Sequence, residues 1–305
     1  MKKTIKTIII LASCCLCAVG CGFDDVKPEY PTKSMLFTYQ FYNRELVVGE
    51  GLKFKLGVVF AGMSENDRDR YATYEIDPSF VPDGYTLMPS EYYTCSDPSR
   101  IKVPKGDFKG YMPVQIDSAA FLADPLATTG KYVIPFKLVE ADADQITPGK
   151  EYMVLSLKYL AKQFGYYQYS GKRTDVETSE EYSYSYRSSE KTSVRQLVTA
   201  GPTTLRVKCD PYGEADPAKT DKYSMLLTLP TRGGGAVTLE ADPDSKVVVE
   251  PNGECSYDES SKTFTLNYKY SAGGKSYTVS ETMTFRNRIR DDQGNGVHID
   301  EWEGF

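Results

Sequence analysis

Short apolar runs alternate with polar residues along most of this chain, with the period of two that is typical of β-strands. In residues 52–56, three apolar side chains alternate with two lysines, which predicts one apolar and one cationic face. Residues 49–51 are Gly-Glu-Gly and lead back to residues 45–48, which predicts a β-hairpin. Strands at this spacing without long helical patterns predict an Ig-like β-sandwich over residues 34–146. Its further strands are expected at 85–88, 101–103, 111–116 and 132–139.

A polar segment at residues 141–149 ends in Pro-Gly, which is typical of a domain boundary. The second domain is therefore expected over residues 147–305, as an antiparallel meander with Gly-containing turns at 251–253 and 272–274. About eight strands joined by short turns predict a closed β-barrel, which removes exposed sheet edges. A second sandwich is the alternative. The second half opens with 151–157 and 165–169, and the eight expected strands of the meander are 181–187, 194–198, 203–209, 224–229, 236–240, 246–250, 263–270 and 276–286.

Residues 1–20 have the features of a bacterial lipoprotein signal peptide. Three lysines precede an uncharged, mostly apolar run of about 14 residues, shorter than the roughly 20 residues of a transmembrane helix. Ala18-Val19-Gly20 precedes Cys21 as a lipobox requires, so we expect cleavage before Cys21 and lipidation of that cysteine. Cys14 is the alternative, but cleavage there leaves an apolar region at the lower limit of length.

Residues 21–33 form an expected tether that begins with an acidic pair, Asp24-Asp25. An acidic pair just after the lipidated cysteine resembles the surface-export signal of Bacteroidetes lipoproteins. We therefore expect the protein on the outer membrane, lipid-anchored and facing the cell exterior. An ordinary periplasmic linker is the alternative.

The chain has 42 acidic and 36 basic residues, a formal net charge of −6, and loses three lysines with the signal peptide. The mature chain is therefore more acidic still. An acidic body without a basic cluster in its sequence argues against nucleic acid or an anionic membrane surface as a partner. The lipid anchor is the only membrane contact that we expect.

Three of the seven cysteines, Cys95, Cys209 and Cys255, belong to the body of the protein. A disulfide between Cys209 and Cys255 is one interpretation, since both fall in the second half of the chain. The favoured interpretation is that all three are small buried hydrophobic residues.

Motifs of enzymes are weak in this sequence. His298 is the only histidine, and the chain has neither a Gly-x-Ser-x-Gly nucleophile motif nor a Gly-rich phosphate loop. A glycosidase needs only two carboxylates at a suitable separation, but nothing in the sequence selects a pair. Residues 291–302 match part of a calcium-binding EF-hand loop, yet Trp302 stands where the bidentate Glu is required, so a turn is favoured. We therefore expect a non-catalytic protein without a metal or cofactor.

Tyrosine is the anomaly of the composition, with 24 residues against a single tryptophan. Residues 182–186 alternate tyrosine and serine, which places three phenol rings on one strand face. Aromatic faces suit the C–H faces of sugar rings, and phenol hydroxyls can bond to sugar hydroxyls. Packing inside a barrel wall is the alternative. The candidate ligand-binding residues are Tyr166, Tyr167, Tyr169, Tyr182, Tyr184, Tyr186 and Trp302.

Several segments resemble a known pair of domains. The first half resembles the N-terminal β-sandwich domain of uncharacterised Bacteroidetes lipoproteins in the order and spacing of GYTLMPSEYY at 84–93, IKVPKG at 101–106 and YVIPFKL at 132–138. The second half resembles their companion domain, a lipocalin-like or calycin-like barrel. That resemblance rests on GYYQY at 165–169 and on the segment 257–290 followed by Glu301-Trp302.

The resemblance covers nearly the whole mature chain and implies an accessory surface lipoprotein of polysaccharide utilisation that binds an oligo- or polysaccharide. Two alternatives stay open. One is an interaction protein that docks on an outer-membrane transporter or a sister lipoprotein, and the other is a binder of a small apolar ligand inside the barrel. Glycan binding predicts exposed rings, whereas an apolar ligand predicts an open lumen. An interaction role predicts a filled barrel and an external apolar patch.

Overall fold

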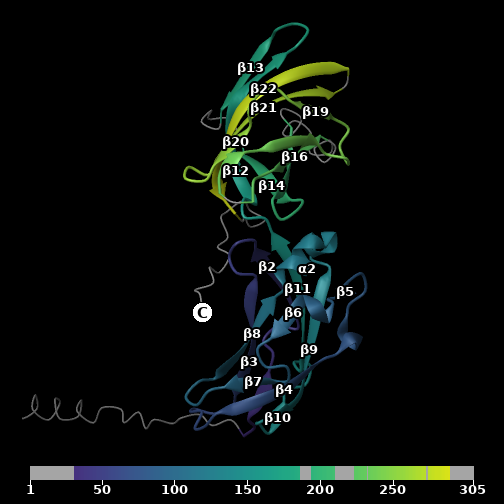
Figure 1. The fold of residues 1–305 in the computed structure, drawn as a ribbon. Helices are drawn as coiled ribbons and strands as arrows, with labels where there is room; N and C mark the ends of the chain where they lie inside the picture. The colour runs from purple at the N-terminus through teal and green to yellow at the C-terminus, as the bar shows by residue number, and fades with distance from the viewer. Residues whose placement is uncertain (1–30, 186–193, 210–222, 232, 273, 289–305) are drawn as a thin grey trace, which may run out of the picture.

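The computed structural model describes residues 31–185, 194–209, 223–231, 233–272 and 274–288. It contains two all-β units placed end to end, a β-sandwich formed by the first half of the chain and a barrel formed by the second (Figure 1). The predicted all-β fold with a sandwich followed by a barrel is therefore confirmed. The predicted signal peptide, Cys21 and most of the tether lie outside the described residues. Within the described ranges, no helix has the length and apolar character needed to cross a bilayer.

The sandwich has two facing sheets. The first contains, in spatial order, β10 (Gln145–Ile146), β1 (Ser34–Leu36), β3 (Lys53–Ala61), β8 (Lys109–Ile116) and β6 (Tyr93–Cys95). The second contains β2 (Phe41–Val47), β11 (Tyr152–Leu160), β9 (Tyr132–Ala141), β4 (Arg70–Ile76) and β7 (Arg100–Val103), with β5 (Thr86–Leu87) paired to β9.

Alternation along the strands accounts for this packing. On β3 and β8, every second side chain is buried between the sheets, while the residues between them are exposed or half-buried. Strands β9 and β11 are instead buried on both faces over most of their length. Short helices occur in the connections between the strands, and one of them, η3, contacts β11. These helices are η1 (Pro78–Phe80), η2 (Ser90–Tyr92), α2 (Ser118–Ala123) and η3 (Pro125–Thr128).

The predicted hairpin between residues 45–48 and 52–56 is wrong. Strands β2 and β3 lie in different sheets, where β2 pairs in parallel with β11 and β3 pairs with β1 and β8. The connection at residues 49–51 therefore crosses from one sheet to the other. Gly49 and Gly51 both have positive φ, at 90° and 100°, a backbone conformation that glycine adopts without strain.

The boundary between the two units lies later than residue 147. Strand β11 pairs antiparallel with β9 and parallel with β2, so it is an inner strand of the sandwich. Its continuous burial explains the difference, because a strand covered on both faces carries an unbroken apolar run. The second unit begins after Leu160.

The barrel is one sheet of eleven strands. Its main path runs through β17 (Gly235–Ala236), β20 (Ser256–Asp258), β21 (Thr263–Ala272), β22 (Lys275–Asn287), β12 (Gly165–Asp175), β14 (Val194–Thr199), β15 (Thr204–Lys208), β16 (Ser224–Thr228) and β18 (Thr238–Ala241). In addition, β13 (Glu181–Ser185) pairs with β12, and β19 (Val248–Pro251) pairs with β21. Because β18 lies beside β19, the sheet nearly closes.

The turns of the barrel follow the predictions only in part. The hairpin at 272–274 is confirmed, since β21 pairs along its whole length with β22, from Thr263 opposite Thr284 to Ala272 opposite Lys275. The turn at 251–253 instead joins β19 to β20, which both pair with β21 and not with each other. Cys95, Cys209 and Cys255 are thiols. Cys209 and Cys255 are buried in the barrel core, as the favoured interpretation states, whereas Cys95 is only half-buried.

A short segment of four residues, from Ala161 to Phe164, joins the units. One ion pair connects the two units directly, from Arg288 of the barrel to Glu50 of the sandwich at 2.8 Å, and a second, Lys162 to Glu259 at 2.6 Å, ties the linker to the barrel. These groups are partly exposed, so each pair contributes at most about 1 kcal/mol.

Candidate ligand-binding cleft

The tyrosines predicted to bind ligand lie in the barrel, and several of them are core residues. Tyr167 and Tyr169 on β12 are buried, while Tyr166 is half-buried. The Tyr167 ring packs edge-on against Phe264 and Phe285, with centroids 5.6 and 5.4 Å away. For Tyr167 and Tyr169 the structure therefore favours the packing alternative over ligand contact.

A buried ion pair organises the middle of the barrel. Arg195 on β14 donates from Nη1 to both carboxylate oxygens of Glu281 on β22, at 2.8 and 3.0 Å. The hydroxyls of Tyr184 and Tyr268 donate to the same carboxylate at 2.8 and 3.1 Å. The Arg195 guanidinium also lies 3.8 Å above the centre of the Tyr169 ring. Each of these polar groups thus has a partner within the barrel.

Tyr182 and Tyr184 share one face of β13, as predicted, with ring centroids 6.3 Å apart. Tyr182 is 55% exposed, whereas Tyr184 is half-buried and turned toward Glu281. Tyr186, Trp302, His298 and the loop 291–302 lie outside the described residues. Of the predicted tyrosines, Tyr182 is therefore the most exposed in the described part of the barrel.

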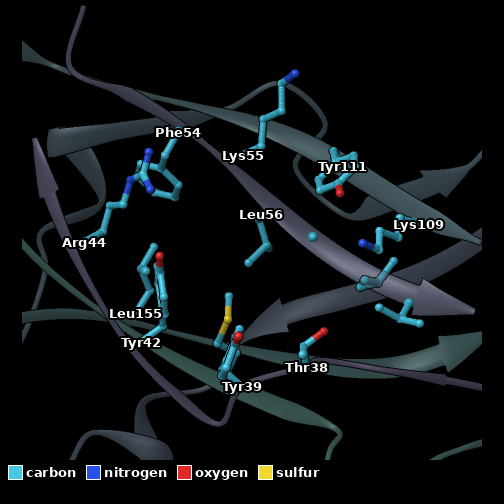
Figure 2. Close-up of a pocket in the computed structure, with 14 residues that line it drawn as sticks. Thr38, Tyr39, Tyr42, Arg44, Phe54, Lys55, Leu56, Lys109, Tyr111 and Leu155 are labelled. Atoms are coloured by element: carbon cyan, nitrogen blue, oxygen red, sulfur yellow. The ribbon is translucent and has the colours of Figure 1, made fainter. Parts of the chain in front are cut away.

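An aromatic cleft of about 410 Å³ lies instead in the sandwich (Figure 2). It forms where β1 ends at Leu36 and the chain crosses to the other sheet to become β2. Strand β1 covers β3 only at residues 59–61, so β3 has no neighbour on that side along residues 53–58. Strand β2 is itself the edge of the second sheet. The cleft therefore lies between two open sheet edges.

The floor of the cleft is apolar and its walls are aromatic. Leu56 of β3 lies in the middle of the view, with Tyr39 and Tyr42 on one side and Tyr111 on the other (Figure 2). The rings of Tyr39 and Tyr42 stack with centroids 5.6 Å apart, and Tyr39 is 58% exposed. The floor is formed by the buried side chains of Phe54, Leu56, Val58, Met153 and Leu155.

Tyr111 owes its position to a glycine. Gly57 on β3 is paired directly with Tyr111 on β8, and a Cβ atom at Gly57 would lie 3.1 Å from the Tyr111 ring. The ring therefore lies over the backbone of β3, where a side chain would otherwise stand. With 53% of its surface exposed, Tyr111 offers an aromatic ring to a ligand in the cleft.

Three cations complete the lining. Arg44 of β2 is half-buried, and Lys55 and Lys109 are exposed on the outer face of the first sheet. A second hollow, of about 540 Å³, adjoins the cleft and shares Lys109 and Tyr111 with it. Its other lining residues are Lys102, Pro104, Asp107 and Phe108. The two hollows therefore meet at Lys109 and Tyr111.

The described residues contain no group of three or more His, Cys, Asp or Glu side chains placed to hold a metal ion. Burial raises the pKa of the Cys95 and Cys255 thiols, which disfavours the reactive thiolate form. The chemistry of the cleft is therefore that of aromatic rings, an apolar floor and cationic side chains.

Sequence reasoning missed this cleft, although it identified the alternation of lysine and apolar residues at 52–56. The missing information is three-dimensional. Tyr39 and Tyr42 are about 70 residues from Tyr111 in sequence, and the crossing of the chain between sheets brings them together. The available signal was Gly57 inside a strand pattern, which marks a close approach.

Comparisons with known proteins agree with this architecture. A family model described as an N-terminal domain matches residues 26–145, and one described as C-terminal matches residues 163–284. The order of the two matches agrees with a sandwich followed by a barrel, and the gap between them, residues 146–162, contains β11, the last strand of the sandwich. The chain thus carries the N-terminal and C-terminal domains that these two models describe. No curated protein matches it significantly.

The solved structures that resemble the chain include the following three. A protein of unknown function from Bacteroides ovatus aligns with a TM-score of 0.68 and 18% identity, covering 86% of this chain and 96% of its own. A second one from the same organism has a TM-score of 0.50 and 14% identity, with 87% and 99% covered. An auxiliary nutrient binding protein from Bacteroides thetaiotaomicron has a TM-score of 0.48 and 14% identity, with 81% and 90% covered. At such identities, the first two establish a shared two-domain fold.

Proposed function

We propose that this protein binds carbohydrate in the sandwich cleft, as a non-catalytic accessory of polysaccharide utilisation. In this proposal it is anchored in the outer membrane by lipid at Cys21 and faces the cell exterior. The observation that carries the proposal is the set of three exposed tyrosine rings, Tyr39, Tyr42 and Tyr111, around an apolar floor.

Sugar rings are amphipathic, with C–H groups on their faces and hydroxyls around their edges. A binding surface for them needs flat aromatic faces with hydrogen-bonding groups nearby. Tyrosine supplies both and has little rotamer freedom to lose on binding. Truncating an aromatic ring at the centre of such a surface weakens binding by roughly tenfold or more.

The lining of the cleft also supports binding without hydrolysis. Glycoside hydrolysis by the common mechanisms uses two carboxyl groups across the scissile bond. No carboxylate lines the 410 Å³ cleft, so its described residues offer no such pair.

The alternative of an apolar ligand inside the barrel has less support. The large side chains of Tyr167, Phe264, Tyr268 and Tyr270 are fully buried there and belong to one hydrophobic core among the described strands. The alternative of docking on a transporter or a sister lipoprotein is tested by the same experiment, since it predicts no glycan ligand.

The test is a glycan-array screen of residues 22–305, followed by titration calorimetry of any glycan that binds. We expect Tyr39→Ala and Tyr111→Ala each to weaken binding by roughly tenfold. Tyr182→Ala is the matched control, because Tyr182 is 55% exposed and Tyr111 is 53% exposed, but Tyr182 lies on the barrel. Absence of binding across plant, host and microbial glycans would contradict the proposal. A loss of binding in Tyr182→Ala alone would move the site to the barrel.

A further inference from the structure

The charge of the cleft is opposite to that of the whole chain. Among the described residues, Arg44, Lys55 and Lys109 line it and no carboxylate does, whereas the chain as a whole carries a net charge of −6. Cationic side chains gathered in a cleft with an apolar floor concentrate the local potential, because field lines are focused where the dielectric constant is low.

The cations and the central ring follow a regular order on the outer face of the first sheet. Strand pairing places Lys55 opposite Pro113, Gly57 opposite Tyr111, and Val59 opposite Lys109. Lys55 and Lys109 are thus separated by four residues along the strands, roughly 13 Å, and Tyr111 lies between them. This order gives a cation, an aromatic ring and a second cation along one line.

Lys109 differs from the neighbouring lysine at the rim of the second hollow. Lys102 is held by Asp69 at 2.6 Å, which neutralises it. Among the described residues, Lys109 forms no ion pair with a carboxylate, and Figure 2 shows its ammonium nitrogen directed toward the cleft. Its charge is therefore available to a ligand.

We propose that the cleft selects an anionic saccharide, in which carboxylate or sulfate groups occur along a chain of sugar rings. The inference rests on the proposed function and specifies its ligand class. Tyr111 stacks on a sugar face, while Lys55 and Lys109 on either side bind acidic groups of flanking residues. Arg44 binds a further acidic group beside Tyr42, where a guanidinium can form two parallel hydrogen bonds to one carboxylate or sulfate.

A saccharide suits this charge pattern better than a nucleic acid does. Nucleic acids carry a phosphate at every nucleotide, and proteins that bind them present wide basic surfaces. Here three cations occur in an acidic protein, so a long and densely charged polyanion would be repelled outside the cleft. A ligand with fewer charges, spaced by uncharged ring surface, matches both the cations and the tyrosines.

The test measures binding of four ligands to residues 22–305 by titration calorimetry at 50 and 300 mM salt. The ligands are a polygalacturonate oligomer, a chondroitin sulfate oligomer, a neutral mannan oligomer and a single-stranded DNA oligomer of similar net charge. We expect at least one of the two acidic saccharides to bind tightest and to bind roughly fivefold or more weakly at 300 mM salt, because salt screens exposed charges. Comparison of the two acidic saccharides then shows whether the cleft prefers the one with carboxylates alone or the one that also carries sulfates.

Two variants separate charge from stacking. The double variant Lys55→Gln and Lys109→Gln should weaken binding of the acidic saccharide roughly fivefold or more. Lys131→Gln, at an exposed lysine of the sandwich outside the cleft, should stay within twofold of the unchanged protein. Unchanged thermal unfolding of all variants shows that the fold is kept.

Three results overturn the inference. If the neutral mannan oligomer binds as tightly as the acidic saccharides and the lysine substitutions have no effect, the cleft does not select anions. The proposed glycan binding is then unaffected. If the DNA oligomer binds tightest, the ligand of the cleft is a nucleic acid and not a saccharide. If none of the four ligands binds and the glycan array also shows no binding, the proposed function is contradicted as well.

Discussion

Tyrosine plays opposite roles in the two halves of this molecule. In the barrel, Tyr169, Tyr184 and Tyr268 surround the buried pair of Arg195 and Glu281, and two of their hydroxyls satisfy the carboxylate. In the sandwich, Tyr39 and Tyr111 are more than half exposed and line a cleft. The same ring is a core residue where the sheet curls on itself and a ligand surface where the sheet ends at an open edge.

This difference shows that clustering of tyrosines in sequence is a poor guide to a binding surface. The two tyrosine clusters at 166–169 and 182–184 lie on adjacent strands of one barrel. The exposed rings are scattered along the chain. What makes these rings available is the open edge of β2 and of β3 and the lack of a side chain at Gly57, and both depend on how the strands of the sheets pair.

The largest expected effect is on the stability of the barrel. Replacing Glu281 by Ala leaves the Arg195 guanidinium buried without its carboxylate, and removing one partner of a buried pair costs about 3–5 kcal/mol. Urea unfolding followed by circular dichroism measures the loss. Glu181→Ala is the control, since Glu181 forms an exposed pair with Lys172 and should cost at most about 1 kcal/mol. Equal costs for the two variants would show that the buried pair does not organise the barrel.

Alkaline pH should also weaken the barrel. Burial raises the pKa of Tyr268 and of Tyr167 above the ordinary value of 10.0. Because the folded pKa is higher than the unfolded one, the stabilising contribution is complete below pH 10 and declines as the pH rises above it. Each phenol should contribute a loss of about 1.4 kcal/mol at pH 11, where the unfolded chain ionises.

The measurement is the free energy of unfolding between pH 8 and pH 11. The double variant Tyr167→Phe and Tyr268→Phe should be less stable at pH 8, because Tyr268 donates to Glu281, but should lose less stability on going to pH 11. A pH dependence equal to that of the unchanged protein would mean that these phenols are not protected by the barrel.

A smaller effect is expected at Gly57 and should appear in binding. An added methyl group would lie 3.1 Å from the Tyr111 ring and displace it from the surface of β3. We expect Gly57→Ala to weaken glycan binding roughly threefold, while the free energy of unfolding changes by less than about 1 kcal/mol. In a Tyr111→Ala background, the same substitution should have no further effect on binding, and a persistent loss would assign another role to Gly57.

The smallest expected effect on stability is at Tyr39. Its ring is 58% exposed and stacks only at the rim of the cleft, so Tyr39→Ala should change the free energy of unfolding by no more than about 0.5 kcal/mol. Urea unfolding under the same conditions as for Glu281→Ala makes the two directly comparable. A loss of more than about 1 kcal/mol in the free energy of unfolding would show that Tyr39 packs against the sandwich and is not part of the ligand surface.

Local patterns in the sequence predicted most strands and the succession of sandwich and barrel. They failed where a strand had no alternation to show, as in β11, or where a glycine turn had two possible partners, as at residues 49–51. The cleft could not be predicted in the same way. It depends on β1 being too short to cover β3, and on Met153 and Leu155 of β11 supplying part of its floor.

The parallel pairing of β2 with β11 has a kinetic consequence. Phe41 pairs with Val154, so β2 waits for a partner on the order of 100 residues later in the chain, whereas β1 can pair earlier with β3. Contacts of such sequence separation slow folding, because a long loop must close before they form. During synthesis, β2 therefore remains unpaired until β11 has followed. The domain nearest the N-terminus completes its second sheet only when more than half of the protein has emerged.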